Sequence, residues 1–182
     1  LAPGAELVVQ VDEPGLPAVL EGRLPTQSGY GRLRAVDRAE VRDGLRTIVD
    51  GLGGAAGLGG AVTVVHCCAA DVPVKLLRES SFGAISLDTS LLDGARWEQV
   101  AEATEAGVGL WVGAVPSDGS ADWRAARDRL LGAWDRVGLD ESALREVVVT
   151  PACGLAGVSP SSAVATLRTT RDLAAALTDL SA

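Results

Sequence analysis

Short runs of β-branched residues alternate with longer segments of helical periodicity, and this alternation constrains the fold more than any other feature of the sequence. The runs predict strands at residues 6–12, 62–68, 83–88, 109–115 and 146–150. The amphipathic or capped segments that separate and follow them predict helices at residues 37–52, 72–79, 96–104, 122–137 and 159–180. Because parallel strands need crossover connections, which are usually helices, this pattern predicts a parallel sheet.

The predicted strands are almost continuously apolar, which is typical of a parallel sheet that helices cover on both faces. Five such units do not close an eight-stranded barrel, which needs about 200 residues or more. We therefore expect an α/β fold, either an open sheet or a partial (β/α)8 TIM barrel without its first strands, in which residues 1–182 form one incomplete domain. The chain has no methionine, even at position 1, and enters a strand almost at once, so we expect it to be a piece of a longer chain.

The composition argues against several classes of partner. The net charge is -8 and the acidic residues are scattered, which argues against binding to nucleic acid or to anionic membranes. No apolar stretch reaches the roughly 20 residues of a membrane span, and no signal segment opens the chain. Three cysteines, two of them adjacent, do not make a disulfide framework, so we expect reduced thiols and a cytoplasmic protein.

The glycine cluster GLGGAAGLGG at residues 51–60 comes close to the spacing of a dinucleotide-binding loop. Such a loop follows a strand and opens a helix. This cluster instead follows a predicted helix and precedes a predicted strand. We therefore interpret it as a helix end and a connecting loop, and a nucleotide-binding sheet is the weaker alternative.

Side chains with metal-binding chemistry stand at the ends of predicted strands. In VTVVHCC, alternate residues of the strand point to the same face, so His66 and Cys68 share a face and Cys67 turns away. Cys153 follows the last predicted strand and Asp88 ends the third. An imidazole nitrogen, two thiolates and a weaker oxygen ligand suit a catalytic Zn²⁺. The alternative is that His66 and Cys68 are core residues, because free cysteine packs as a small hydrophobe.

Four segments occur in order along the chain: VVQVDEPGLP, HCC after a strand, ISLDTS and VTPACGLAG. Together they resemble the C-terminal catalytic barrel of cobalamin-independent methionine synthase, especially its short actinobacterial-type members, over essentially the whole chain. The resemblance implies a TIM barrel truncated on its N-terminal side and zinc-dependent methyl transfer to the thiol of homocysteine, which makes methionine. It also implies a set of zinc ligands, namely His66, Cys68, Asp88 and Cys153. Asp88 replaces a glutamate of the family, and Asp12 matches the aspartate that holds the amino group of homocysteine.

The sequence departs from the family pattern where the family contacts the methyl donor. Ala18 stands in place of a folate-contacting glutamate, and the proton-donating histidine of the family falls near Ala114, in a chain whose only histidine is His66. The upstream strands that contact homocysteine in the family lie outside the sequence. The methyl donor therefore stays open between methyltetrahydrofolate and a methylcorrinoid protein. The alternative to an enzyme is an inactive zinc-binding fragment that forms a homodimer through exposed sheet edges.

Overall fold

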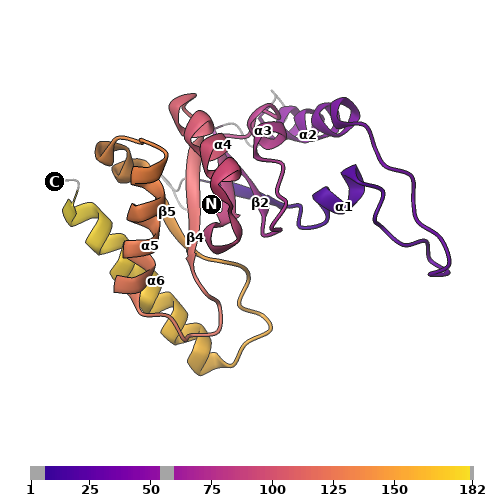
Figure 1. Cartoon of the computed structure of the whole chain (residues 1–182). Coiled ribbons are helices and arrows are strands. Elements are labelled where there is room, and N and C mark those ends of the chain that lie inside the picture. Colours follow the sequence, from indigo (N-terminus) through magenta and orange to yellow (C-terminus); the bar gives the residue numbers. More distant parts are fainter. Residues whose placement is uncertain (1–6, 54–59, 181–182) are drawn as a thin grey trace. The chain divides into compact units, whose positions relative to one another are not determined.

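Five parallel strands form one sheet in the computed structural model, which describes residues 7–53 and 60–180 (Figure 1). The strands lie in the order β1-β2-β3-β4-β5, so each strand neighbours the ones that precede and follow it in the sequence. Their bounds are Val8–Asp12 (β1), Val62–Cys67 (β2), Ala84–Asp88 (β3), Gly109–Val115 (β4) and Val148–Pro151 (β5). This order, with helices between the strands, is that of consecutive units of a TIM barrel. The structure confirms the predicted α/β fold and is consistent with a partial barrel.

Helices connect the strands and follow the last one. The α-helices of the described residues are Leu16–Leu20 (α1), Arg38–Gly53 (α2), Val74–Arg78 (α3), Gly94–Glu105 (α4), Trp123–Arg136 (α5) and Pro160–Leu180 (α6). The 3-10 helices are Thr89–Leu91 (η1) and Glu141–Glu146 (η2). The predicted helices correspond to α2 to α6, whereas α1, η1 and η2 were not predicted. No helix in the described ranges combines the length and the apolar composition needed to cross a membrane.

Polar N-caps fix the starts of the helices in the second half of the chain. The carboxylates of Asp93 and Asp122 accept hydrogen bonds from backbone N–H groups in the first turns of α4 and α5. The Ser159 hydroxyl accepts a hydrogen bond of 3.1 Å from the backbone N of Ser162, and Pro160 opens α6. The predicted start of α6 is confirmed, and each such cap stabilises its helix by about 1 kcal/mol.

The glycine cluster begins at the end of α2. This helix ends at Gly53 and β2 begins at Val62, which is the predicted order of helix, glycines and strand. The helix end is therefore confirmed. Residues 54–59, on which the connecting-loop interpretation also rests, lie outside the described residues.

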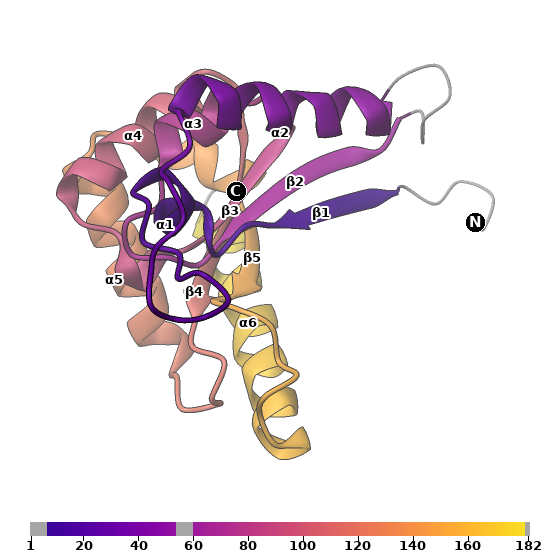
Figure 2. The same cartoon turned by 90° about the vertical axis from the view of Figure 1, so that its right-hand side faces the viewer.

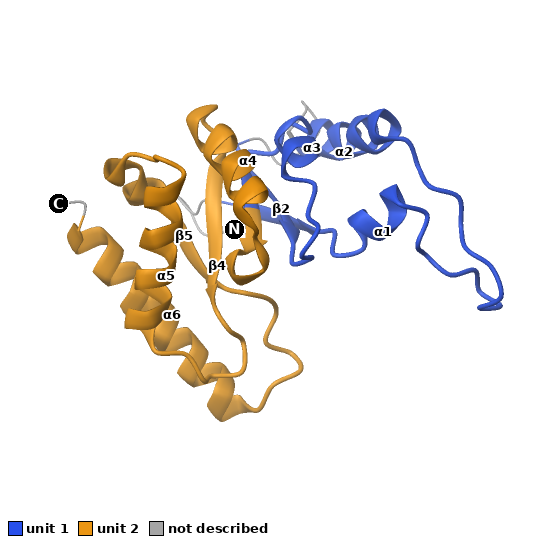
Figure 3. Cartoon of the chain, viewed as in Figure 1, with its two compact units in different colours: residues 1–85 blue, residues 86–182 orange. Residues whose placement is uncertain are grey.

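The chain divides into two compact units, residues 1–85 and residues 86–182 (Figure 3). In the first unit, β1 and β2 lie side by side in a parallel register that pairs Asp12 with His66 (Figure 2). Every residue of β2 after Val62 is buried, whereas no residue of β1 is fully buried. The well-packed strand β2 is therefore the rigid element that positions His66.

The second unit packs α5 and α6 side by side against β4 and β5 (Figure 1). Its core includes Val112, Trp134 and Leu173, of which Val112 and Leu173 are fully buried. The buried Thr166 of α6 donates a hydrogen bond of 3.1 Å to the backbone oxygen of Ser117, in the segment that follows β4. This bond ties the start of α6 to the carboxyl end of the strands, where α/β proteins place their sites.

Candidate metal centre

The carboxyl end of β2 carries the residues that the sequence singles out. His66 is buried with 9% of its surface exposed, Cys67 is fully buried, and Cys68 is partly exposed just after the strand. Successive residues of a strand point to opposite faces, so His66 and Cys68 share a face and Cys67 does not. The backbone N of Glu13, the residue after β1, donates a hydrogen bond of 2.8 Å to the backbone oxygen of His66. The strand end is therefore held by its neighbour.

The Cys67 thiol is buried, whereas Cys68 is partly exposed and Cys153 is exposed. Burial raises the pKa of Cys67 to about 11, and the nearby charges of Asp71 and Glu13 also act to raise it. Because a metal ligand or nucleophile must be a thiolate, Cys67 stays a protonated thiol at neutral pH. The structure therefore agrees with a packing role for Cys67.

This difference predicts selective alkylation. In folded, metal-free protein at about pH 8, iodoacetamide is expected to label the exposed Cys153 and to leave Cys67 almost unlabelled, because only thiolates react. Mass spectrometry of the cysteine peptides measures the labelling, and the urea-unfolded chain, in which all three cysteines react, is the control. Equal labelling rates for Cys67 and Cys153 in the folded chain would show that the Cys67 thiol is not protected.

Cys153 lies just after β5, beyond an irregular stretch of pairing. The register of β4 with β5 shifts between Gly113 and Val115. After the shift, Ala152 N donates a hydrogen bond of 2.8 Å to the oxygen of Val115, and the Ser117 hydroxyl donates one of 3.1 Å to the oxygen of Cys153. These bonds hold the backbone of an exposed cysteine at a fixed position.

Gly113 is the residue that allows this close approach of chain segments. A Cβ atom at this position would lie 2.6 Å from the backbone oxygen of Leu87 and 2.8 Å from the Cα of Ala152. Both distances are shorter than side chains tolerate, so only glycine fits without displacing backbone. Glycine at position 113 of β4 therefore lets Ala152, the residue before Cys153, lie close to this strand.

Three predicted ligands come together. His66, Cys68 and Cys153 each offer one ligand atom, and these atoms all lie within 4.8 Å of one another. Two ligands of a tetrahedral zinc ion are roughly 3.5–3.8 Å apart, given bonds of 2.0–2.3 Å to nitrogen and sulfur. The 4.8 Å limit is about 1 Å longer than this spacing. One nitrogen and two sulfurs form a donor set that fits Zn²⁺ and disfavours Mg²⁺ or Ca²⁺.

Asp88, the fourth predicted ligand, does not belong to this group of three. It ends β3 and caps η1, with Oδ1 accepting hydrogen bonds from the backbone N of Ser90 (3.0 Å) and from the Ser90 hydroxyl (2.6 Å). A carboxylate has about four lone-pair positions, and these two bonds leave acceptor capacity for another partner. Ligation by Asp88 therefore stays a prediction.

Two carboxylates follow one another at the end of β1. Asp12 lies in register with His66, is exposed, and accepts a hydrogen bond of 2.7 Å from Gln10 Nε2. Burial raises the pKa of the neighbouring Glu13, whose backbone holds His66. The sequence interpretation assigned Asp12 a substrate contact and gave Glu13 no role at the site. The position of Glu13 directly after β1, which pairs with β2, could have predicted that this residue lies beside His66.

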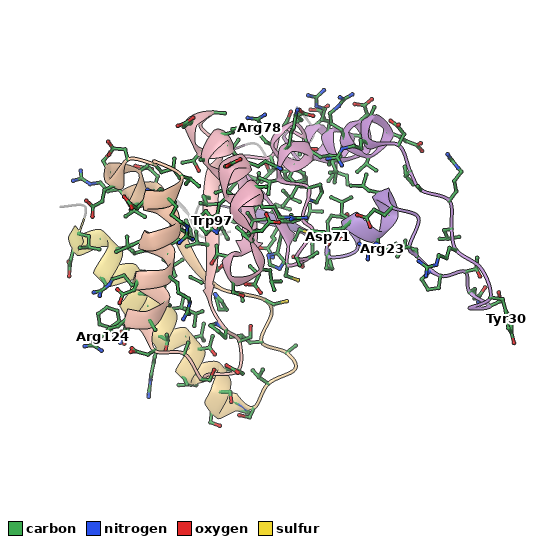
Figure 4. All side chains as sticks on the ribbon, in the orientation of Figure 1. Arg23, Tyr30, Asp71, Arg78, Trp97 and Arg124 are labelled. Atoms are coloured by element: carbon green, nitrogen blue, oxygen red, sulfur yellow. The ribbon has the colours of Figure 1, made fainter. Side chains whose placement is uncertain are left out.

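An ion pair joins the segments that follow β1 and β2. Arg23 contacts the carboxylates of Glu21 and Asp71, and Figure 4 shows Arg23 and Asp71 from these two segments. All three side chains are partly exposed, so the pair contributes little to stability, on the order of 0–1 kcal/mol. Its effect is geometric, because it links the chain after Asp12 to the chain after Cys68. Sequence patterns do not reveal a pair that is 48 residues apart.

A protein-family profile matches nearly the whole chain. The profile of the family described as "Cobalamin-independent synthase, Catalytic domain" matches residues 2–176. No curated protein matches the chain. The match covers nearly the whole sequence and confirms the resemblance carried by the four ordered segments.

Proposed function

Because the chain belongs to the family of the catalytic domain of cobalamin-independent synthases, we propose that it binds zinc through His66, Cys68 and Cys153 and transfers a methyl group to the thiol of homocysteine. One observation carries the proposal: the ligand atoms of these three residues lie within 4.8 Å of one another. His66 and Cys68 share a face of one strand end, and Cys153, 85 positions later in the sequence, completes the group.

Zinc, when bound, acts as a Lewis acid. It would favour the thiolate form of the homocysteine thiol, since a free thiol has a pKa of about 8.5. Cys68 and Cys153 would hold the ion through their sulfurs, and His66 would hold it through a ring nitrogen at the end of a buried strand. Two sulfur ligands donate electron density to the ion, which would keep a thiol activated there nucleophilic. The homocysteine sulfur forms a bond to the methyl carbon as the bond from that carbon to the donor breaks, and the thiol proton passes to solvent. We propose Asp88 as the fourth ligand, released by rotation away from Ser90.

Asp12 is proposed to hold the ammonium group of homocysteine. Replacing Asp12 by asparagine is expected to weaken homocysteine binding by about 10- to 100-fold, because a charge-assisted hydrogen bond becomes a neutral one. Titration calorimetry of homocysteine into the zinc-loaded chain measures this loss. Gln10→Ala is the control, since it removes a hydrogen-bond partner of Asp12 and keeps the carboxylate. An affinity unchanged in the asparagine variant would remove Asp12 from the site.

Two methyl donors are open for the proposed reaction, methyltetrahydrofolate and a methylcorrinoid protein. Ala18 offers no carboxylate to a folate, and the chain has no second histidine to protonate a folate leaving group. A methylcorrinoid donor needs neither group, whereas methyltetrahydrofolate is the donor of the parent family. Formation of methionine from homocysteine, measured with each donor in turn, decides between them.

The second candidate is a zinc-binding fragment without turnover, which pairs with another copy through its sheet edges. Exposed apolar residues on both outer strands favour it, because Val8 of β1 is 45% exposed and Val148 of β5 is 41% exposed. Exposed apolar edges of this kind invite strand pairing, and proline is present only at the last residue of β5, Pro151. Light scattering is expected to give twice the mass of the chain if this reading is right.

The two candidates make different predictions for the same zinc-loaded sample. Methionine formation with either donor supports the methyltransferase. A chain that holds one zinc per molecule, forms a dimer and turns over neither donor supports the fragment. A chain that holds no zinc contradicts both.

A further inference from the structure

A cavity of about 250 Å³ lies within the second unit. It is bounded by η1, the start of α4, β4 and one face of α5. Its chemically distinctive lining residues are Thr89, Ser90, Trp97, Arg129, Gly132 and Arg136. At roughly 30 Å³ for each water, the volume would hold about eight waters or a molecule of around ten heavy atoms.

Two positive charges border this cavity without a protein partner. In the described part of the chain, no hydrogen bond or ion pair joins Arg129 or Arg136 to another side chain. Asp128, which also lines the cavity, is occupied by Arg127 at 2.7 Å. The cavity is therefore cationic in a chain whose net charge is -8. Guanidinium groups match carboxylate and phosphate in geometry and charge.

Gly132 keeps the space between the two arginines open. Residues 129, 132 and 136 lie on one face of α5, because residues three or four apart on a helix are neighbours. A Cβ atom at position 132 would meet only Arg136 Nη1, at 3.9 Å. Packing therefore does not require glycine here, although glycine is unfavourable within a helix. A side chain at this position would instead fill the cavity.

Two residues of η1, Thr89 and Ser90, bring hydrogen-bond acceptors to the cavity. The Thr89 hydroxyl donates to the backbone oxygen of Gly113 at 3.2 Å, and the Ser90 hydroxyl donates to Asp88 Oδ1 at 2.6 Å. Each hydroxyl has one hydrogen, which is already donated. The Thr89 and Ser90 oxygens can therefore only accept a hydrogen bond from a ligand. The buried Trp97 also lines the cavity and adds apolar surface to it.

We propose that this cavity binds a small hydroxylated dianion, either a dicarboxylate or a phosphate ester. The anionic groups face Arg129 and Arg136, and the ligand hydroxyl donates to the oxygen of Thr89 or Ser90. This proposal does not rest on the methyl transfer proposed above, although Ser90 of the cavity also donates a hydrogen bond to Asp88, the proposed fourth zinc ligand.

The test is titration calorimetry of the chain with malate, a hydroxylated dicarboxylate, and with glycerol 3-phosphate, a hydroxylated phosphate ester. At least one is expected to bind with a Kd of about 1 mM, more weakly at high salt, as exposed arginines imply. Succinate, which lacks the hydroxyl of malate, should bind more weakly than malate. Binding by malate alone assigns a dicarboxylate, and binding by glycerol 3-phosphate alone assigns a phosphate ester.

Matched variants locate the binding. Arg129→Gln and Arg136→Gln should each weaken it by about tenfold, and Gly132→Leu should remove it by filling the cavity. Arg124→Gln is the control, because Arg124 lies over the Trp123 ring at 4.3 Å and does not line the cavity. Circular dichroism checks that each variant folds. No binding of either probe, or equal binding by wild type and by folded Gly132→Leu and Arg136→Gln variants, would overturn the proposal.

Discussion

Replacing Cys153 by serine is expected to lower the zinc affinity of the chain by about 100-fold and to abolish methyl transfer. Zinc sites of this kind bind with roughly 10–16 kcal/mol, so each of four ligands accounts for about 3 kcal/mol, or a hundredfold in affinity. A serine hydroxyl is protonated at neutral pH and does not replace a thiolate. Competition with a chromophoric chelator measures the affinity, and methionine formation measures the transfer.

The chain offers its own control for this experiment. Cys67→Ala removes a thiol from the residue next to Cys68, but the Cys67 thiol is buried and protonated at neutral pH. This variant should lose some stability and keep its zinc affinity. His66→Ala should behave like Cys153→Ser. Equal zinc affinity in Cys153→Ser and wild type, or loss of zinc in Cys67→Ala with the fold intact, would contradict the ligand assignment.

Gly113→Ala is expected to destabilise the fold by about 2–3 kcal/mol and to weaken zinc binding as well. The added Cβ would lie 2.6 Å from the oxygen of Leu87 and 2.8 Å from the Cα of Ala152, and backbone atoms cannot rotate away as a side chain does. Relief of this overlap moves the chain at Ala152, and the neighbouring Cys153 moves with it. Urea denaturation monitored by tryptophan fluorescence measures the stability.

The matched control is Gly44→Ala, in the interior of α2. A Cβ atom at Gly44 would meet nothing within 4 Å, so alanine should stabilise the helix by up to about 1 kcal/mol. The same chemical change thus has opposite expected signs at the two sites. A Gly113→Ala variant as stable as wild type would mean that β4 and the segment after β5 separate at little cost. The proposed placement of Cys153 would then lose its support.

The strands and long helices were predictable because each satisfies a local rule. Apolar runs rich in β-branched residues predict β2 and β4. Ser159 as an N-cap and Pro160 as the first helical residue predict the start of α6. The helices α1, η1 and η2 were missed because segments of three to six residues are too short to show helical periodicity. Of the predicted strand 6–12, residue 6 lies outside the described residues and residue 7 precedes β1, and strand boundaries are the hardest feature to predict.

The candidate ligands were suggested by the strand pattern. Alternation along one strand placed His66 and Cys68 on one face, the position of Cys153 after another strand suggested a third ligand, and ligation by all three stays a prediction. Asp88 could not be assigned in this way, because its carboxylate bonds to Ser90, and this contact depends on how η1 turns. The cavity beside Arg129 and Arg136 was also invisible in the sequence. The cavity depends on how α5 packs, and this packing decides which of its arginines form ion pairs.

The central claim is that one ion draws its ligands from His66, Cys68 and Cys153, and zinc K-edge X-ray absorption of the zinc-loaded chain tests it directly. The account predicts two sulfur ligands at about 2.3 Å and a nitrogen-and-oxygen shell at about 2.0–2.1 Å, with the sulfur count falling by one in Cys153→Ser. A spectrum with no sulfur shell, or with a sulfur count unchanged in that variant, would contradict it.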